Sequence, residues 1–462
     1  MKKQISLILA LGMTLLMAAC GTGTADPSQP ASPIEQETTA EPTRVDGPKE
    51  TLPAISREAV IEETVLVDED GVKITATELT YGRNAAEISL LIENSTEKDL
   101  SFICESVGYS RNSINGFMIQ DGYLNCDVAA GKKARDSVRF DYHWLDLFGI
   151  RELADIELGF DIVDEDYNNT YTGPRQLRTS AYEGHENNMD TYQTSICDPA
   201  TQNTFEYTLP YFSTDAVYEE EGVRTCSVGM MVKEDGTQNI LLELENTTDQ
   251  TVHVDASNTV INDLAVSAYG CGRLSLTPGK RGVLLLTPGD AIAEELRELY
   301  GIGELHSFGV SLQQKDEDWS ALTPEIPVRV QLTETVAPFD ASGTEVFNQG
   351  GVRILSKTIV PSPSRHSEDL LVLLLAENSS GDTVLIEDEY DSLSVNGMMM
   401  DGSFEGKLLQ DGQSGILIIE LDGDDLEENQ IKAPEDITEL EIGIDIWQEN
   451  DRIDSGVLKI TY

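Results

Sequence analysis

Alternation of apolar and polar positions is the clearest pattern in the chain. Residues 156–162 and 440–446 place an apolar residue at every second position, with Glu, Gly or Asp between them. A weaker version of the same pattern runs through Phe308, Val310 and Leu312. A period of two predicts a strand with one buried face and one wet face, which is typical of antiparallel sheet.

Further landmarks recur around this strand in the same order, which indicates three copies of one unit. Each copy has an apolar strand ending in a Glu-Asn turn, at residues 93–96, 245–248 and 377–380. An Asn-Gly or Asn-Asp pair follows and predicts a tight hairpin turn with positive φ, at residues 115–116, 262–263 and 396–397. A glycine turn then precedes another strand, at Gly131, Gly279 and Gly412.

A short helical signal lies between the glycine turn and the alternating strand. In the second copy, Asp290 is expected to cap a helix whose apolar residues Ile292, Leu296 and Leu299 share one face. Gly301 is expected to end that helix in a left-handed conformation. Shorter equivalents stand at residues 145–149 and 425–428.

Several short strands with close turn signals predict a mainly β fold of tandem two-sheet antiparallel sandwiches, each with a short helix. We call residues 58–180 repeat 1, residues 204–335 repeat 2 and residues 336–462 repeat 3. Residues 181–203 match nothing in the other copies and are interpreted as a linker or long loop. Residues 20–57 are rich in Thr, Pro, Ser and Glu, and they are expected to form a disordered tether.

The N-terminus predicts export and lipid anchoring. Lys2 and Lys3 precede an apolar run that is too short to span a bilayer, and residues 1–19 are interpreted as a signal peptide. Residues 16–21, Leu-Met-Ala-Ala-Cys-Gly, resemble the bacterial lipobox, with Met17 where Leu is commoner. That resemblance implies that Cys20 is diacylated and becomes the new N-terminus, so the protein is expected on the extracellular face of the cell membrane. The alternative is an ordinary signal peptide with a chance cysteine.

The repeated landmarks resemble the Ig-like β-sandwich modules that recur in tandem in lipid-anchored surface proteins of Gram-positive, clostridia-type bacteria. The resemblance covers the chain from about Val60 to Tyr462. It includes a glycine-plus-basic turn at residues 131–133 and 279–281, which repeat 3 replaces with Gly-Gln-Ser at 412–414. It implies three tandem Ig-like domains with extracellular binding or spacing roles, and it brings no catalytic residues.

Charge narrows the possible partners. The 462 residues carry 31 Lys+Arg against 83 Asp+Glu, a formal net charge of −52. Nucleic-acid binding requires clustered basic residues, so a general nucleic-acid binder is excluded. The acidic residues are spread over all copies, which favours solubility and repulsion from an anionic envelope over one acidic binding patch.

No catalytic or metal-binding motif stands out. The five histidines occupy different places in the copies, and no nucleophile elbow or His-Glu-x-x-His motif is present. Acidic clusters at residues 68–70, 164–168 and 422–425 suggest calcium, but the middle one has Asn169 and Arg175 where a calcium loop needs Gly and Glu. We therefore expect solvated acidic turns, no metal, no cofactor and no catalytic residues.

Five cysteines remain once Cys20 is lipidated, and their redox state stays open. Oxidation is possible outside the cell, so Cys104 could pair with Cys126 and Cys226 with Cys271, leaving Cys197 over. Repeat 3 has no cysteine, so the unit does not require a bridge. Free thiols are the equal alternative.

These observations predict a non-enzymatic surface lipoprotein that binds or spaces an unknown protein or glycan ligand, attached to the membrane through its N-terminal lipid. The alternative is an extracellular hydrolase that uses two carboxylates on envelope or environmental glycans. Such an enzyme should carry an elaborate insertion in one copy, and residues 181–203 are the one insertion found. A solute-binding lipoprotein would need two α/β lobes, against which the strand-rich repeats argue.

Overall fold

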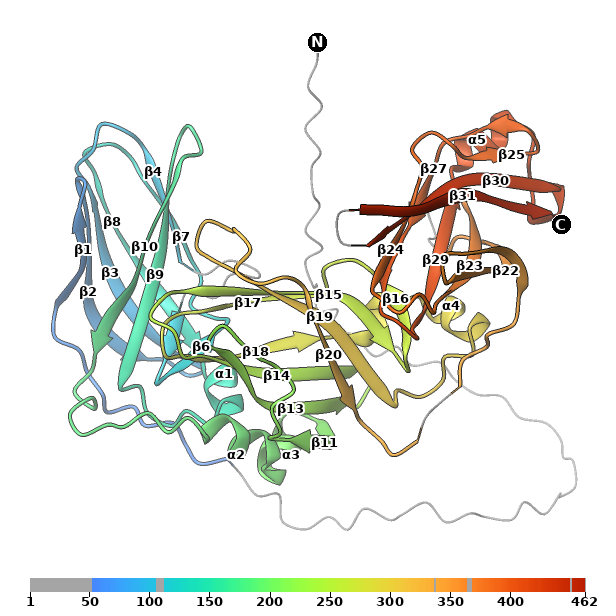
Figure 1. Ribbon diagram of the computed structural model, residues 1–462. Helices are drawn as coiled ribbons and strands as arrows, with labels where there is room; N and C mark the ends of the chain where they lie inside the picture. Colours follow the sequence, from blue (N-terminus) through green and yellow to red (C-terminus); the bar gives the residue numbers. More distant parts are fainter. Residues whose placement is uncertain (1–51, 105–111, 336–337, 364–367, 449–450, 462) are drawn as a thin grey trace, which may run out of the picture. The chain divides into compact units, whose positions relative to one another are not determined.

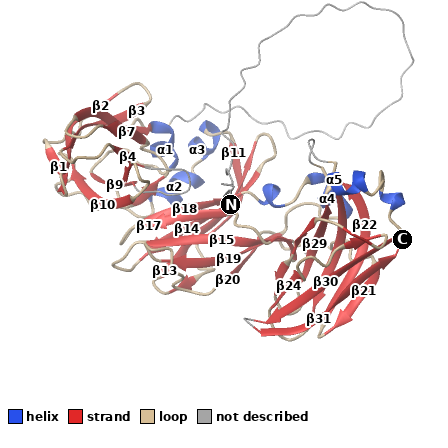
Figure 2. Ribbon diagram, turned by 90° about the horizontal axis from the view of Figure 1, so that it is seen from above, coloured by secondary structure: helices blue, strands red, loops and turns tan. Residues whose placement is uncertain are grey.

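The computed structural model describes residues 52–104, 112–335, 338–363, 368–448 and 451–461. The signal peptide, Cys20 and most of the predicted tether lie outside these residues. The described residues consist mainly of β-strands, with short helices of three to seven residues between them (Figures 1 and 2). The prediction of a mainly β, antiparallel fold is therefore confirmed. No helix in this described part has the length and apolar character that a membrane span needs.

Repeat 1 has a four-stranded antiparallel sheet in the order β1-β2-β3-β8 and a second group around β9. Buried side chains from both groups, including Ile74, Ile88, Phe102 and Phe160, form one core cluster. The elements are β1 (Thr64–Glu69), β2 (Val72–Tyr81), β3 (Ala85–Asn94), β4 (Leu100–Cys104), β5 (Asn112–Ile114), β6 (Phe117–Ile119), β7 (Leu124–Val128), β8 (Lys133–Asp141), α1 (Tyr142–Leu147), β9 (Asp155–Asp164) and β10 (Asn169–Arg178).

Residues 181–203, expected as a linker or long loop, contain the short helix α2 (Thr191–Cys197) and all but the last residue of α3 (Pro199–Thr204). Asp198 caps α3 through a bond from the Ala200 N–H to its carboxylate, and Pro199 opens that helix. Tyr192 and Ile196 of α2 are buried in the core cluster of repeat 1. The apolar face of α2 thus holds the segment against repeat 1.

Repeat 2 follows the same plan as repeat 1. One sheet contains β13, β14 and β18, the other contains β15 and β19, and their buried side chains form a second cluster. The elements are β11 (Tyr207–Ser213), β12 (Glu219–Glu220), β13 (Val223–Lys233), β14 (Gln238–Asn246), β15 (Val252–Ile261), β16 (Leu264–Ser267), β17 (Gly272–Leu276), β18 (Arg281–Leu286), η1 (Pro288–Ala291), α4 (Glu294–Leu299), β19 (Ser307–Lys315) and β20 (Ile326–Gln331).

Repeat 3 has β22, β23 and β29 in one sheet and β24 and β30 in the other, around a third cluster. The elements are β21 (Thr344–Gln349), β22 (Val352–Pro361), β23 (Leu370–Asn378), β24 (Val384–Asp388), β25 (Ser394–Val395), β26 (Met398–Met399), β27 (Gly402–Glu405), β28 (Lys407–Leu409), β29 (Ser414–Leu421), α5 (Gly423–Glu428), η2 (Pro434–Asp436), β30 (Glu439–Gln448) and β31 (Asp451–Thr461).

The side chain of the asparagine in the Glu-Asn turn makes the same hydrogen bonds in every repeat. Its side chain is at most 2 % exposed in all three copies: Asn94, Asn246 and Asn378. In repeat 2 its Nδ2 donates to the carbonyls of Gln250 and Leu276, at 2.7 and 2.9 Å, and its Oδ1 accepts from the Thr248 N–H at 2.9 Å. The other two copies repeat these bonds. One buried amide therefore closes its own turn and ties that turn to a strand about 30 residues further along the chain.

The predicted positive-φ turns are confirmed at Asn115, Asn262 and Asn396, with φ of 50°, 50° and 52°. Each of these asparagines also accepts bonds from two consecutive backbone N–H groups at the start of the alternating strand or just before it. The turn thus fixes the hairpin against β9, β19 or β30. Gly301 adopts a φ of 65°, as expected for a helix end.

The start of the second-copy helix differs from the prediction. Asp290 lies inside the 3₁₀ turn η1, and Ile292 is extended with φ −156° and ψ 131°, so the chain leaves helical geometry before α4 begins. The N-cap of α4 is Ala293, whose side chain has no oxygen with which to cap. Ile292 and Leu296 are buried as expected, whereas Leu299 is 38 % exposed.

Both junctions between repeats use the same positions of the unit. In one repeat the pairing residue lies two positions after the asparagine of the Asn-Gly or Asn-Asp turn. In the next repeat its partner lies two positions after the glycine of the glycine turn, and the two strands run parallel. Phe117 pairs with Arg281 at the first junction, and Leu264 pairs with Ser414 at the second. Consecutive repeats therefore share a sheet, as the order of strands in the two largest sheets shows.

The residue that follows each of these pairing residues enters the core of the next repeat. Met118 is 2 % exposed and belongs to the cluster of repeat 2. Ala265 is also 2 % exposed and belongs to the cluster of repeat 3. Since an apolar side chain crosses each junction, the cores are joined rather than merely adjacent.

Candidate functional site

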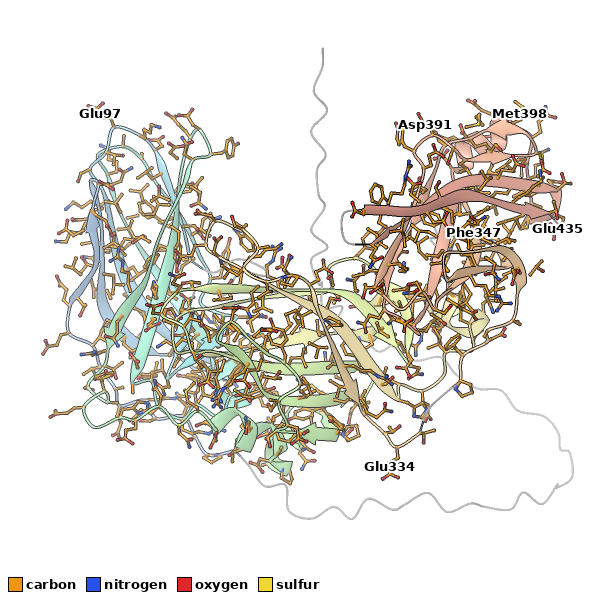
Figure 3. All side chains as sticks on the ribbon, in the orientation of Figure 1. Glu97, Glu334, Phe347, Asp391, Met398 and Glu435 are labelled. Atoms are coloured by element: carbon orange, nitrogen blue, oxygen red, sulfur yellow. The ribbon has the colours of Figure 1, made fainter. Side chains whose placement is uncertain are left out.

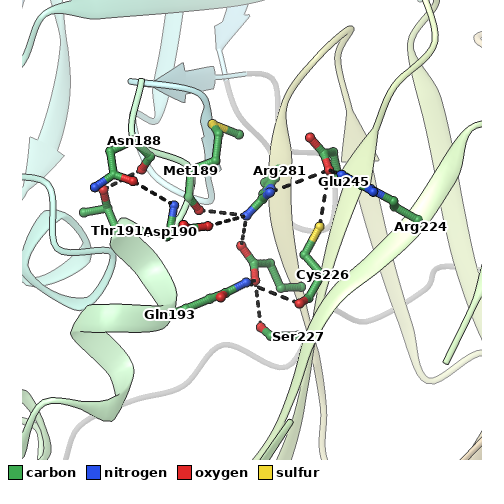
Figure 4. A network of polar contacts seen from close by, with 11 residues as sticks. Asn188, Met189, Asp190, Thr191, Gln193, Arg224, Cys226, Ser227, Glu245 and Arg281 are labelled. Carbon is green, nitrogen blue, oxygen red and sulfur yellow. Dashed lines mark hydrogen bonds and ion pairs between the residues drawn. The ribbon is translucent and has the colours of Figure 1, made fainter. Parts of the chain in front are cut away.

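The junction between repeats 1 and 2 contains a dense polar network of the described residues, shown in Figure 4. It begins at the turn of Gly279, which directs Lys280 and Arg281 toward repeat 1. The Arg281 N–H donates to the Gly116 carbonyl at 2.9 Å. Gly116 itself has a φ of 90°, and a Cβ there would lie 2.8 Å from the Met189 sulfur. The positive φ favours glycine, and its missing side chain leaves room for Met189 and Asn187 of the linker.

A buried carboxylate lies at the centre of the network. Glu243 on β14 is fully buried, and one of its oxygens accepts bonds of 2.7 Å from the Ser227 hydroxyl and from Gln193 Nε2. Burial raises the pKa of Glu243, and the bonds from Ser227 and Gln193 and the charge of Arg281 oppose that rise. The carboxylate therefore joins the linker helix α2 to the sheet of repeat 2.

Arg281 supplies the compensating charge. Its side chain is 11 % exposed, and its Nη1 lies 3.4 Å from Glu243 Oε1. The same Nη1 donates to the Met189 carbonyl at 2.8 Å and lies 3.7 Å from Asp190. One guanidinium thus neutralises a buried carboxylate and fixes the linker backbone, which the fork of donors in arginine makes possible.

A second carboxylate extends the network toward solvent. Glu245 accepts from Arg224 Nε and Nη2 at 2.9 and 2.7 Å, and Cys226 Sγ lies 3.4 Å from the same oxygen. Burial pushes the pKa of Glu245 up, but Arg224 and Arg281 outweigh burial and the net shift is downward. Burial also raises the pKa of Cys226 to about 12. This thiol is consequently protonated and a poor nucleophile at neutral pH.

Lys280 makes an ion pair across the same junction. Its Nζ lies 2.9 Å from Glu157 Oε1 of β9, and the two side chains are only 10 and 15 % exposed. Lys280 and Arg281, the basic pair of the glycine turn, therefore both contact repeat 1. At the second junction, Gln413 stands at the position of Lys280, and it lines a cavity together with Gly309.

Sequence reasoning missed Glu243, although a signal was present. The residue three positions before the landmark asparagine is Leu91 in repeat 1 and Leu375 in repeat 3, but Glu243 in repeat 2. A single charge at a position that is apolar in the other copies indicates a local partner. Only the tertiary structure identifies that partner as Arg281.

The cysteines proposed for disulfides can be compared with their surroundings in the structure. Cys126, Cys226 and Cys271 are thiols in the structure, and burial raises the pKa of each one. Cys104 Sγ lies 3.2 Å from Asn112 Oδ1. In the ladder between β4 and β7, Cys126 is opposite Phe102, so the two cysteines of repeat 1 are not directly paired across the strands.

The acidic clusters at residues 164–168 and 422–425 accept hydrogen bonds from their own turn or helix end, whereas Glu69 of the cluster at 68–70 pairs with Arg175 of β10. Asp164 Oδ1 accepts from the N–H groups of Asp166 and Asn168, and Lys98 pairs with the same carboxylate at 2.6 Å. The bonds from Asn168 and Lys98 lower the pKa of Asp164. Asp422 caps α5. Among the described residues, no group of three or more His, Cys, Asp or Glu side chains is placed to hold a metal ion.

Large apolar side chains near the Asn-Gly turns could contact a partner if they are exposed. Tyr109 lies outside the described residues, and Phe117 is buried at the first junction. Tyr123 is 62 % exposed, and Met398 and Met399 are 55 and 62 % exposed. Met398 is labelled in Figure 3.

No family model matches the chain, and no curated protein matches it. Among solved structures, a bacterial ice-binding adhesin is 10 % identical, over 82 % of this chain and 90 % of its own, with a TM-score of 0.14. A biofilm-associated protein domain is 10 % identical over 90 and 84 % of the two chains, with a TM-score of 0.15. An exo-chitosanase of Amycolatopsis orientalis is 6 % identical over 85 and 79 %, with a TM-score of 0.16. TM-scores this low do not establish a shared fold or function.

Proposed function

We propose that this protein is a lipid-anchored, non-catalytic surface module whose rigidly joined repeats hold a bound partner away from the membrane. The observation that carries the proposal is the repeated junction. Two junctions use the same turn positions, share a sheet and pass an apolar side chain into the next core. Such coupling restricts motion between repeats, which a spacer requires and which a flexible string of domains lacks.

The residue after the short helix also takes part in the contact between repeats. The residue after the short helix is apolar or aromatic where another repeat follows: Phe148 in repeat 1 and Tyr300 in repeat 2. Tyr300 is fully buried, and its hydroxyl donates to the Leu374 carbonyl of repeat 3 at 2.8 Å. In repeat 3, where no further repeat follows in this sequence, the same position is Asn429.

A second position of the unit, on the sheet that meets the preceding repeat, also differs between repeats. Five residues before the landmark asparagine, repeats 2 and 3 carry Leu241 and Leu373, which are buried in the clusters that cross the junctions. Repeat 1 carries Ser89 at that position. The two junctions therefore place apolar side chains at matching positions of the unit.

The non-catalytic part of the proposal rests on the roles of the perturbed carboxyls. Burial raises the pKa of Asp121, Asp146 and Glu243. Asp121 accepts from the Asp141 N–H, Asp146 pairs with Arg151, and Glu243 serves the junction. Each shifted group is thus engaged in holding the fold, and we propose none of them as an acid or base.

The anchoring part predicts complete dependence on Cys20. In a bacterial host supplied with an alkyne fatty acid, the natural chain should be labelled and should sediment with membranes. Cys20→Ser should abolish the label, because the acyl chain has no other attachment point in the lipobox. Cys197→Ser is the matched control and should leave labelling unchanged. Equal labelling of Cys20→Ser would contradict lipidation at Cys20.

The spacing part predicts a single distance between repeats 1 and 3. Spin labels carried by non-natural amino acids at exposed Glu97 and Asp391 (Figure 3) should give one narrow distribution in a pulsed dipolar measurement. Ala265→Asp should broaden it, since a charge would enter the core of repeat 3. A distribution as broad in the natural chain as in Ala265→Asp would count against a rigid spacer.

A further inference from the structure

A cavity of about 400 Å³ lies beside the first junction, between α1, the linker helices and the sheet of repeat 2. Its wall is mainly apolar and includes Trp144 of α1, Tyr192 of α2, and Leu285 of β18. The volume falls within the range of small-molecule sites, which are usually apolar with a few well-placed polar groups. It is separate from the Glu243 network, none of whose residues lines it.

One buried donor in this cavity has no partner. Asn239 on β14 is 2 % exposed and lines the cavity. Its Oδ1 accepts from the Thr287 hydroxyl at 3.0 Å, but its Nδ2 has no hydrogen-bond partner in the described structure. An unsatisfied buried donor is destabilising, and a native site that keeps one calls for an acceptor.

A positive charge lies on the same wall. Met231 pairs with Asn239 across the ladder between β13 and β14, and Lys233 stands two residues further along the same face of β13. Lys233 lines the cavity and remains exposed. The wall therefore offers an apolar interior, a buried N–H donor and a cation that retains contact with water.

We propose that this cavity binds a small amphipathic carboxylate. The apolar tail would lie against Trp144 and Leu285, and one carboxylate oxygen would accept from Asn239 Nδ2. Lys233 would favour the anionic head over a neutral one. This proposal goes beyond the spacer function and does not depend on it, because the cavity is formed within the described residues whether or not the chain is anchored.

Decanoate is the probe for this site, and Trp144 is a built-in reporter. In a Trp319→Phe, Trp447→Phe background, saturable binding should change the fluorescence of Trp144 and should also give heat in isothermal titration. Asn239→Asp keeps the acceptor for Thr287 but loses the donor and adds a like charge, so decanoate should bind at least about tenfold more weakly. Decanol should also bind at least about tenfold more weakly than decanoate.

Leu285→Trp tests the location without touching the buried polar group. Leu285 is 50 % exposed, so the larger ring can fill the cavity from its open side, and binding should be lost. Leu322→Trp is the matched control, since Leu322 is 45 % exposed and lines no part of this cavity; it should bind as the parent does. The proposal is overturned by no saturable response in the parent, or by equal binding in Leu285→Trp. Decanol binding as tightly as decanoate would overturn the carboxylate assignment.

Discussion

Arg281→Met is expected to lower the free energy of unfolding of repeat 2 by about 3–5 kcal/mol. The substitution leaves Glu243 fully buried without its cation and removes the donor that holds the Met189 carbonyl. In a Trp144→Phe, Trp447→Phe background, Trp319 becomes the one remaining tryptophan and lies in repeat 2. Its fluorescence during urea denaturation measures the transition of that repeat.

The pH dependence identifies the cause of this loss. The pKa of Glu243 is raised in the folded chain, so the folded state binds the proton more tightly than the unfolded state. Protonation of Glu243 therefore stabilises the fold at low pH, and this stability is lost as the pH rises through the folded pKa. Without Arg281 the pKa should rise further, so the deficit of Arg281→Met should be larger at about pH 8 than at about pH 5.

Two variants serve as controls. Glu243→Gln added to Arg281→Met should recover at least about 2 kcal/mol, because the uncompensated charge is gone. Arg224→Met should cost less than about 1 kcal/mol, because the side chain of Arg224 is 48 % exposed and its pair with Glu245 is screened by solvent. A deficit that is independent of pH and of Glu243 would refute a role for the buried pair.

Asn246→Asp is expected to destabilise repeat 2 by at least about 3 kcal/mol. The change is isosteric, so it leaves packing intact. It removes both Nδ2 donations and turns a carboxylate oxygen toward the carbonyls of Gln250 and Leu276 at a site that is fully buried. The same urea denaturation, followed by Trp319 fluorescence, measures it.

Asn125→Asp is the matched control for this substitution. Asn125 lies on β7 of repeat 1 and is exposed, so the same chemical change should alter the stability of that repeat by less than about 0.5 kcal/mol, read from Trp144 fluorescence in the Trp319→Phe, Trp447→Phe background. Asn94→Asp and Asn378→Asp should destabilise their own repeats as strongly as Asn246→Asp destabilises repeat 2, because the bonds are the same. A loss below about 1 kcal/mol for Asn246→Asp would mean that the turn asparagine is not a structural determinant.

Local chemistry made much of each unit predictable. Positive φ at Asn115, Asn262 and Asn396 follows from the tolerance of asparagine for the left-handed region, and alternation of apolar residues predicted the buried faces of β9 and β30. The start of α4 was not predictable in the same way. Asp290 is a good cap by composition, but buried Ile292 takes an extended conformation that delays the helix.

Tertiary contacts also bury positions of an alternating strand that the sequence pattern predicted to be exposed to solvent. In β19, Ser307, Gly309 and Ser311 stand at the positions expected to face water, yet all are buried. Periodicity reports only the character of the side chains. It carries no information on whether a neighbouring segment covers the polar face, and small residues there permit such a cover.

The sequence by itself determined the unit: an antiparallel sandwich, its turns, its repetition and the acidic surface, because these depend on contacts and conformations within short stretches of chain. Only the tertiary structure decided how units join. Lys280 of repeat 2 forms its ion pair with Glu157 of repeat 1, and Met118 belongs to one repeat in sequence but to the core of the next in space. Such contacts depend on how the folded surfaces of two repeats fit together. Residues of both repeats determine that fit, so no single segment of the sequence predicts it.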